Sequence, residues 1–223
     1  MEETMASFDS FSPETLGFLS DLKANNTKEW FAANKTAYQS HLKEPGKRFA
    51  DAMVLALRDL TGCSHASKIF RIHRDLRFSK DKTPYNAYLH IAFIPSGQES
   101  PPPMWFFGLS PEKLSLGCGV FQYDKDALPL FRSAMAGPKG KELSQLTADL
   151  REAGIRVGAP ELKRVPAGFD KAHPHEAALR RKGFAAWIDR DDPAFAVEPN
   201  LVKRTVEAFD PLMPVFRLLG KVI

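Results

Sequence analysis

The sequence has little cysteine, with only Cys63 and Cys118 among 223 residues. Two cysteines cannot supply the several cross-links that hold small secreted scaffolds together, so we expect no disulfide framework. The sequence also lacks an apolar run as long as a membrane span. Residues 1–10 are acidic and have no basic start followed by an apolar stretch, which does not fit a secretory signal. We therefore expect a cytoplasmic protein with no membrane association.

Motifs that would name a common reaction are missing as well. Residues 137–142 have the wrong glycine spacing for a Walker loop, and Glu142 stands where Ser or Thr must contact magnesium. The pair His175-Glu176 lacks the second histidine of a zinc protease helix. No Gly-x-Ser-x-Gly segment occurs. The sequence therefore leaves the cofactor, the reaction type and the oligomeric state unknown.

The composition is that of an ordinary globular protein, at 43% hydrophobic and 26% charged residues. A chain of this length is large enough to bury one core. We expect residues 1–10 to form a loose tail and residues 11–223 to form one domain.

Apolar spacing and turn residues separate the chain into helices, then strands, then mixed elements. Helices are expected at about 13–25, 28–42, 45–61, 125–135, 139–153, 174–183 and 199–219, the last one interrupted by two prolines. Strands are expected at about 68–78, 87–94, 104–109, 113–121, 155–157 and 184–188, with residues 96–103 as an exposed loop. Adjacent strands joined by hairpins predict an α+β fold, with a mainly antiparallel sheet flanked by N-terminal and C-terminal helices.

One expected strand has an unusually bare face, because Ser115, Gly117 and Gly119 alternate along it. Such a face leaves room for a ligand or a loop. It can equally be filled by a neighbouring aromatic ring such as Trp105 or Phe107, and we favour this second interpretation.

Residues 71–85 hold the densest charge pattern of the chain, with three arginines, two lysines and two aspartates between apolar residues. In an extended segment from 68 to 78, alternate side chains lie on opposite faces. The expected apolar face carries Arg74 together with Phe70, Ile72, Leu76 and Phe78. The expected polar face carries Arg71, His73, Asp75 and Arg77. This pattern predicts a half-buried strand that presents several guanidinium groups.

Arginine suits planar capture of phosphate or carboxylate, because its donors form a rigid fork. We therefore expect Arg71, Arg77 and Lys82 to bind anionic charge. Asp75 or Asp81 would orient these cations or act as a catalytic base, and Tyr85 would donate a hydrogen bond. The alternative is a purely structural network of arginines and aspartates. Arg74 is the member most suited to that role, and we expect Asp75 or Asp81 to pair with it.

A second basic segment lies further along the chain. Residues 68–85 and 163–182 each contain six basic and two acidic residues, although the whole chain has a net charge of only +4. Lys163 and Arg164 could present cations to a ligand, while His173 acts as an acid or base or only caps a helix. The pairs His173 with His175 and His73 with Asp75 lack a third ligand, so we expect no metal.

The charged segment also resembles the signature of a known family. The matching positions are Arg71-x-x-Arg74-Asp75-x-Arg77-Phe78, Asp81-Lys82 and Tyr85, with Phe18-Leu19, Asn25-Asn26 and Glu29-Trp30-Phe31 before them, and Leu162-Lys163-Arg164-x-Pro166-x-Gly168-Phe169 and His173-Pro174 after them. This pattern is similar to a widespread family of bacterial proteins of about this length that form a domain of unknown function. The resemblance covers roughly residues 11–219, and it carries no activity over.

The sequence thus favours a protein that binds a small anionic ligand, bearing phosphate or carboxylate, in a pocket lined by Arg, Lys and Asp. Whether such a pocket would be catalytic stays open. A non-enzymatic module for nucleic acid or for a protein partner is the alternative. The pI near 9.0 supports nucleic-acid binding. We do not favour it, because most aromatic residues lie in apolar patterns typical of a core.

Overall fold

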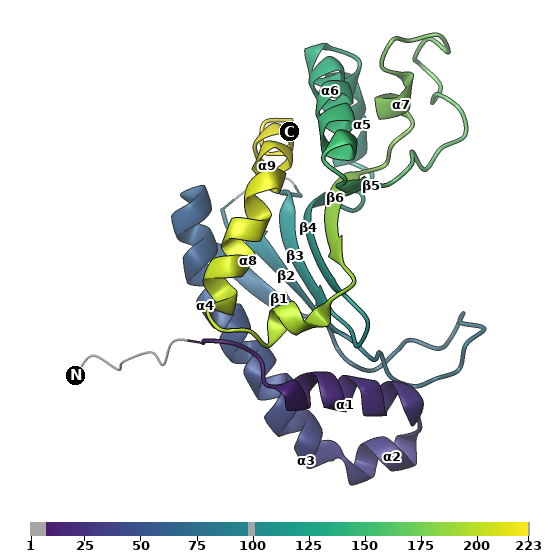
Figure 1. Cartoon of the computed structure of the whole chain (residues 1–223). Helices are drawn as coiled ribbons and strands as arrows, with labels where there is room; N and C mark the ends of the chain where they lie inside the picture. Colours follow the sequence, from purple (N-terminus) through teal and green to yellow (C-terminus); the bar gives the residue numbers. More distant parts are fainter. Residues whose placement is uncertain (1–7, 98–100, 223) are drawn as a thin grey trace. The chain divides into compact units, whose positions relative to one another are not determined.

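The computed structural model describes residues 8–97 and 101–222 (Figure 1). The chain divides into two compact units that are described in turn. Unit 1 consists of Met1–Phe93, Phe106–Ser115 and Arg190–Ala208. Unit 2 consists of Ile94–Trp105, Leu116–Asp189 and Phe209–Ile223.

A six-stranded antiparallel sheet confirms the expected α+β class. The strands follow the order β1 (His65–Ile69), β2 (Leu89–Pro95), β3 (Met104–Leu109), β4 (Leu114–Val120), β6 (Phe184–Arg190) and β5 (Arg156–Val157). Strands β3 and β4 form the expected hairpin, closed by the N–H of Ser110 donating to the carbonyl of Lys113 at 2.9 Å. In the β5–β6 pair, Arg156 lies opposite Trp187 and Val157 opposite Ala186.

Unit 1 begins with helices whose ends follow from the sequence. They are α1 (Pro13–Ala24), α2 (Lys28–Ala33), α3 (Lys35–Ala37) and α4 (Glu44–Thr61), with α8 (Leu201–Phe209) later in the chain. Pro13 occupies the first turn of α1, where its missing N–H costs nothing. Thr27 caps α2 by accepting the N–H of Trp30 at 3.2 Å. Gly62 ends α4 in the left-handed conformation, at a φ of 76°.

The break expected before Pro45 does not occur. A π-helical segment, Tyr38–Lys43, instead joins α3 to α4 without interruption. The N–H of Glu44 reaches the carbonyl of Gln39, five residues back. This wider turn carries the helix past a proline that cannot donate a hydrogen bond of its own.

The core of unit 1 is rich in aromatic rings. Phe11 lies 5.4 Å from Phe49, and Phe49 lies 4.5 Å from Phe107, between ring centroids.

Residues 1–7 of the expected loose tail lie outside the described residues. Phe8, which follows them, is buried against Phe11 at 5.1 Å. The carboxylate of Asp9 accepts the N–H of Asn200 at 2.8 Å. Phe8 and Asp9 are therefore held by contacts within unit 1. Of the exposed loop expected at residues 96–103, positions 98–100 also lie outside the described residues.

Unit 2 contains α5 (Ala127–Met135), α6 (Pro138–Glu152), the short α7 (Glu176–Leu179) and α9 (Met213–Leu219). Helices α5 and α6 lie side by side (Figure 1). The interruption expected from the two prolines is confirmed, because a 3-10 turn, Asp210–Leu212, precedes α9. Trp105 packs on Phe209 and Phe216, at 4.8 and 5.2 Å between ring centroids. None of the described helices is both long and apolar enough to cross a bilayer.

An aromatic ring fills the bare face of β4, as favoured, but it is Trp187 of β6 and not Trp105 or Phe107. A Cβ added to Gly117 would lie 2.5 Å from Cε3 of the Trp187 ring. The glycine is needed because the indole lies directly on the strand backbone.

We predict that Gly117→Ala destabilises the protein by about 1–3 kcal/mol, because the added methyl overlaps Trp187 and forces the ring to move. The free energy of unfolding in urea measures this change. Gly17 is the matched control, since it lies exposed in α1 and an added Cβ meets no atom within 4 Å. Gly17→Ala should stabilise by up to about 1 kcal/mol. An unchanged stability for Gly117→Ala would contradict the packing described.

Candidate functional site

The charged segment forms a loop of unit 1, which we call the signature loop (residues 71–85), and not the strand expected at 68–78. Strand β1 ends at Ile69. Beyond it, the N–H of Arg74 donates to the carbonyl of Pro84 at 3.0 Å, and the N–H of Asn86 donates to that of Ile72 at 2.7 Å. These two bonds form an isolated antiparallel bridge between His73 and Tyr85. The loop therefore folds back on itself.

The expected division into an apolar and a polar face holds only in part, because Arg71, His73, Asp75 and Arg77 are exposed but both ends of the expected apolar face are exposed as well. Ile72 is buried, but Phe70 is 44% exposed and Phe78 is 96% exposed. The carboxylate of Asp75 accepts the N–H of Arg77 at 3.2 Å, and that of Asp81 accepts the N–H of Thr83 at 2.9 Å. These side-chain to backbone bonds turn the chain in place of a strand ladder.

Arg74 braces the loop, as expected for the structural member of the group. Its guanidinium donates to Asp81 at 2.5 Å, to the carbonyl and hydroxyl of Thr83, and to Ser79 at 3.2 Å. The backbone N–H of Thr83, the Arg74 guanidinium and the Thr83 hydroxyl lower the pKa of Asp81 to about 2. General bases work best with a pKa near the operating pH. These contacts therefore favour bracing over catalysis for Asp81.

Arg77 and Lys82, two of the expected anion-binding cations, are also engaged within the loop. Arg77 forks onto Asp75, with Nε at 3.0 Å from Oδ1 and Nη2 at 2.6 Å from Oδ2. This pairing lowers the pKa of Asp75, the other expected base. Lys82 Nζ donates to the carbonyl of Leu76 at 3.0 Å. The side chain of Arg71, by contrast, has no hydrogen bond or ion pair to any described residue.

Tyr85 lies in the core and not on the loop surface. Its ring is 7% exposed and stacks on Phe31 at 4.1 Å between centroids. The side chain of Asn26 holds its backbone, accepting the N–H at 3.0 Å and donating to the carbonyl at 2.9 Å. These contacts favour a packing role for Tyr85.

A shallow depression of about 350 Å³ lies beside the loop, and we call it the signature hollow. Its lining includes Phe70, Arg71, His73, Asp75, Tyr88 and His90. Of the expected site residues it brings together only Arg71 and Asp75. Arg77, Asp81, Lys82 and Tyr85 do not line it.

The residues expected in the second basic segment belong to unit 2. Lys163 and Arg164 are exposed on an irregular stretch of chain. His173 Nδ1 accepts the N–H of His175 at 3.0 Å, and its carbonyl accepts the N–H of Glu176 at 3.0 Å. Helix α7 thus begins at Glu176, two residues later than expected, and His173 supports the turn before it. This geometry favours the capping interpretation of His173.

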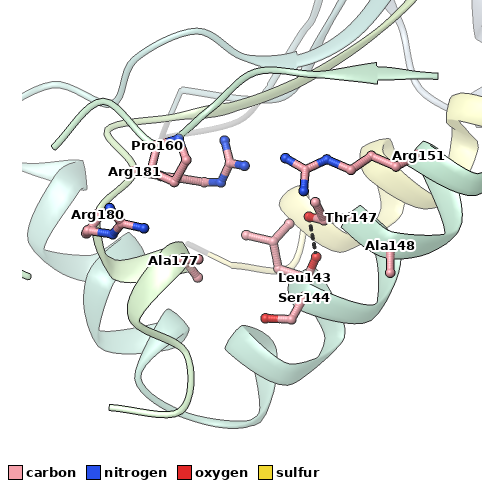
Figure 2. Close-up of a pocket in the computed structure, with 10 residues that line it drawn as sticks. Leu143, Ser144, Thr147, Ala148, Arg151, Pro160, Ala177, Arg180 and Arg181 are labelled. Atoms are coloured by element: carbon pink, nitrogen blue, oxygen red, sulfur yellow. Dashed lines mark hydrogen bonds between the residues drawn. The ribbon is translucent and has the colours of Figure 1, made fainter. Parts of the chain in front are cut away.

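A second depression lies nearby in unit 2, and the sequence analysis missed its main residues. We call it the arginine hollow; it has a volume of about 340 Å³ and lies between α6 and the segment around α7 (Figure 2). Its lining includes Ser144, Thr147, Arg151, Pro160, Arg180 and Arg181. The signal in the sequence was the pair Arg180-Arg181 between apolar Leu179 and Phe184.

Arg181 is the exceptional member of the arginine hollow. The residue is only 5% exposed, yet no carboxylate or other acceptor among the described residues bonds its guanidinium. The guanidinium lies over the ring of Phe184, 5.0 Å from the centroid. Burial lowers the pKa of Arg181, and the nearby charges of Arg151 and Arg180 lower it further, while Glu161 acts in the opposite direction. The charge stays on the side chain, because arginine is not deprotonated in proteins.

The other polar groups of the arginine hollow are already partnered. Arg180 contacts Glu176, with 2.7 Å between Nε and Oε2 and 3.2 Å between Nη2 and Oε1. The hydroxyls of Ser144 and Thr147 each donate to the carbonyl four residues back in α6, both at 2.7 Å. The donors left are therefore the guanidinium groups of Arg151 and Arg181. Figure 2 shows these two groups turned toward one another.

The described residues do not form a cluster of potential metal ligands. Within residues 8–97 and 101–222, no three side chains of His, Cys, Asp or Glu are close enough to hold an ion together. The arginine hollow is lined by cations, which repel a metal ion and attract an anion.

Comparison with protein families gives a match over most of the chain. Residues 14–217 fit the model of a family described as a conserved hypothetical protein, and this range includes both hollows. The search of curated proteins finds no significant match.

We predict that His90 stays neutral down to about pH 4. Its ring stacks on Tyr88 at 3.8 Å between centroids, and a Cβ at Gly108 would lie 3.1 Å from its Cδ2. Although the residue as a whole is exposed, these contacts remove water from part of the ring, which, with a smaller effect from Lys113, lowers the pKa of His90 to about 4. An NMR titration of the imidazole protons measures this value directly.

The lowered pKa of His90 also determines how the stability of the protein changes with pH. His90 binds a proton in the unfolded chain below about pH 6.5, but in the folded protein only below about pH 4. Its contribution to stability should therefore fall as the pH drops from about 6.5 to about 4. Tyr88→Leu should raise the pKa, because it opens the ring to water. A wild-type pKa near 6.5 would contradict the shielding described.

Proposed function

The chain belongs to the DUF2461 family of conserved hypothetical proteins, and we propose that it binds a small anionic ligand in the arginine hollow. The ligand would carry a phosphate or carboxylate group. One observation carries the proposal: Arg181 is only 5% exposed, its guanidinium has no hydrogen bond or ion pair to a described residue, and it faces a second guanidinium, that of Arg151.

Such an arrangement is unfavourable unless something compensates for it. A buried cation loses its hydration, at an effective cost of several kcal/mol, and a like charge nearby adds repulsion. An anion between the two guanidinium groups replaces the lost hydration and turns the repulsion into two attractions. Charge-assisted hydrogen bonds from arginine to phosphate or carboxylate are among the strongest in proteins.

The remaining groups suit the same ligand. Arg180 lies at the edge of the hollow, where Glu176 fixes its position and offsets its charge. The Ser144 and Thr147 hydroxyls, whose protons are donated to α6, can only accept bonds from protonated parts of a ligand. The volume of about 340 Å³ lies at the lower end of known ligand pockets, which favours a small molecule.

The signature loop supports this role less well. Arg74 and Arg77 are paired with Asp81 and Asp75, so their charges are already compensated.

We also propose the cytoplasm as the location. The free cysteines Cys63 and Cys118 fit a reducing compartment.

We predict opposite effects of Arg181→Met on the free and the liganded protein. The thioether can still pack on Phe184, while the uncompensated charge is removed, so the free variant should be at least as stable as the wild type. Phosphate at tenfold its dissociation constant should stabilise the wild type by about 1.4 kcal/mol, or about 3–6 °C in Tm. The variant should lose this gain. Thermal unfolding in phosphate and in chloride of equal ionic strength measures both effects.

Arg156→Met is the matched control, because Arg156 pairs with Asp189 outside the hollow. It should keep the full gain from phosphate. The proposal fails if neither phosphate, pyrophosphate nor a dicarboxylate raises the wild-type Tm, or if Arg181→Met and the wild type gain equally.

A further inference from the structure

Phe78 is held out into solvent by a loop that is otherwise firmly connected. Its side chain is 96% exposed. On either side of it, Arg77 is forked onto Asp75, Arg74 bonds Asp81 and Ser79, and Lys82 bonds the carbonyl of Leu76. The loop thus uses its polar side chains to fix its own shape. It leaves its largest apolar ring without burial, which is unfavourable in water and available to a partner.

More aromatic rings are accessible in the adjoining signature hollow. Phe70 is 44% exposed, and Lys68 Nζ lies 5.3 Å from its ring centroid. Tyr88 lines the hollow and stacks on His90, with 20° between the ring planes. Arg74 and Asp75, which also line the hollow, belong to the same signature loop as Phe78. Phe78 follows Asp75 by three residues, a span of at most about 11 Å.

The uncompensated charge around these rings is positive. Both aspartates of the signature loop form ion pairs, Asp81 with Arg74 and Asp75 with Arg77. Arg71 and Lys80 form no ion pair with a carboxylate that the structure describes, and Arg71 acts on Asp75 only through its charge. The amide of Asn86 donates to the carbonyl of Arg71 at 3.3 Å, which leaves its side-chain oxygen free to accept from a base edge.

From this combination we infer that the signature hollow and Phe78 form a binding surface for single-stranded nucleic acid. Accessible aromatic faces stack with unpaired bases, and interspersed cations follow the phosphate backbone. A duplex does not fit equally well, because its bases are already stacked on one another. The surface lies in unit 1 and shares no residue with the arginine hollow, so the inference does not rest on the function proposed above.

The experiment is a fluorescence anisotropy titration with a labelled oligothymidine of about 12 nucleotides, within the length that small single-strand binding surfaces cover. The wild-type protein should bind it. Phe78→Ala should weaken binding about fivefold or more, and Phe70→Ala should do the same, because each removes a stacking ring. Phe78→Ala cannot unfold the protein through lost packing, since the ring is almost fully exposed. Phe121→Ala removes a ring that is 53% exposed in unit 2 and should leave the affinity unchanged.

Salt and competing ligands complete the test. The logarithm of the affinity should fall by about 0.7 per phosphate contacted for each tenfold rise in salt, hence by about 2 if Lys68, Arg71 and Lys80 all take part. Arg181→Met should bind the oligonucleotide like the wild type. The inference is overturned by no binding at low salt, by equal binding of Phe78→Ala, or by tighter binding to a duplex or to vesicles of anionic lipid.

Discussion

A guanidinium can leave water only where another interaction replaces its hydration, and this constraint gives the arginines of the chain different roles. In the signature loop, Asp81 and Asp75 compensate Arg74 and Arg77. Exposed pairs of this kind add little global stability, so their effect is to fix the local shape of the loop. Arg181 is buried without an ion pair to a described residue, and only the charge of Glu161, which does not bond it, acts in its favour. The proposed ligand site follows from that imbalance.

Much of the fold follows from periodicity and turn residues. The α+β class, the hairpin at Ser110 and the interruption near Pro211 all come from local signals that tertiary packing leaves intact. The errors have physical causes. The π-helical segment before Pro45 replaces a break, because an i→i+5 turn needs no donor from the proline. The strand expected beyond Ile69 is lost, because aspartate side chains bond the loop backbone more effectively than a strand ladder does.

The candidate site was predictable only where partners lie close in sequence. Arg74 and Asp81 are seven residues apart, and Asp81 was one of the two aspartates expected to pair with Arg74. Arg151 and Arg181 come from distant segments, and helix packing brings them to one hollow. Burial of Arg181 could not be inferred either, because arginine is mostly exposed in proteins. The prediction for the face of Gly117 was right about an aromatic ring but wrong about which one. The register of β6 places Trp187 there, and this register could not be inferred from the sequence.

The most direct test of the central claim is a crystal structure of the protein grown in selenate, a phosphate-like anion that anomalous scattering can locate. The account predicts an anomalous peak within hydrogen-bond distance of the guanidinium groups of both Arg151 and Arg181. An empty hollow in which Arg181 has turned to pair with a carboxylate such as Glu161 would show that the protein neutralises this charge by itself, and would contradict the account.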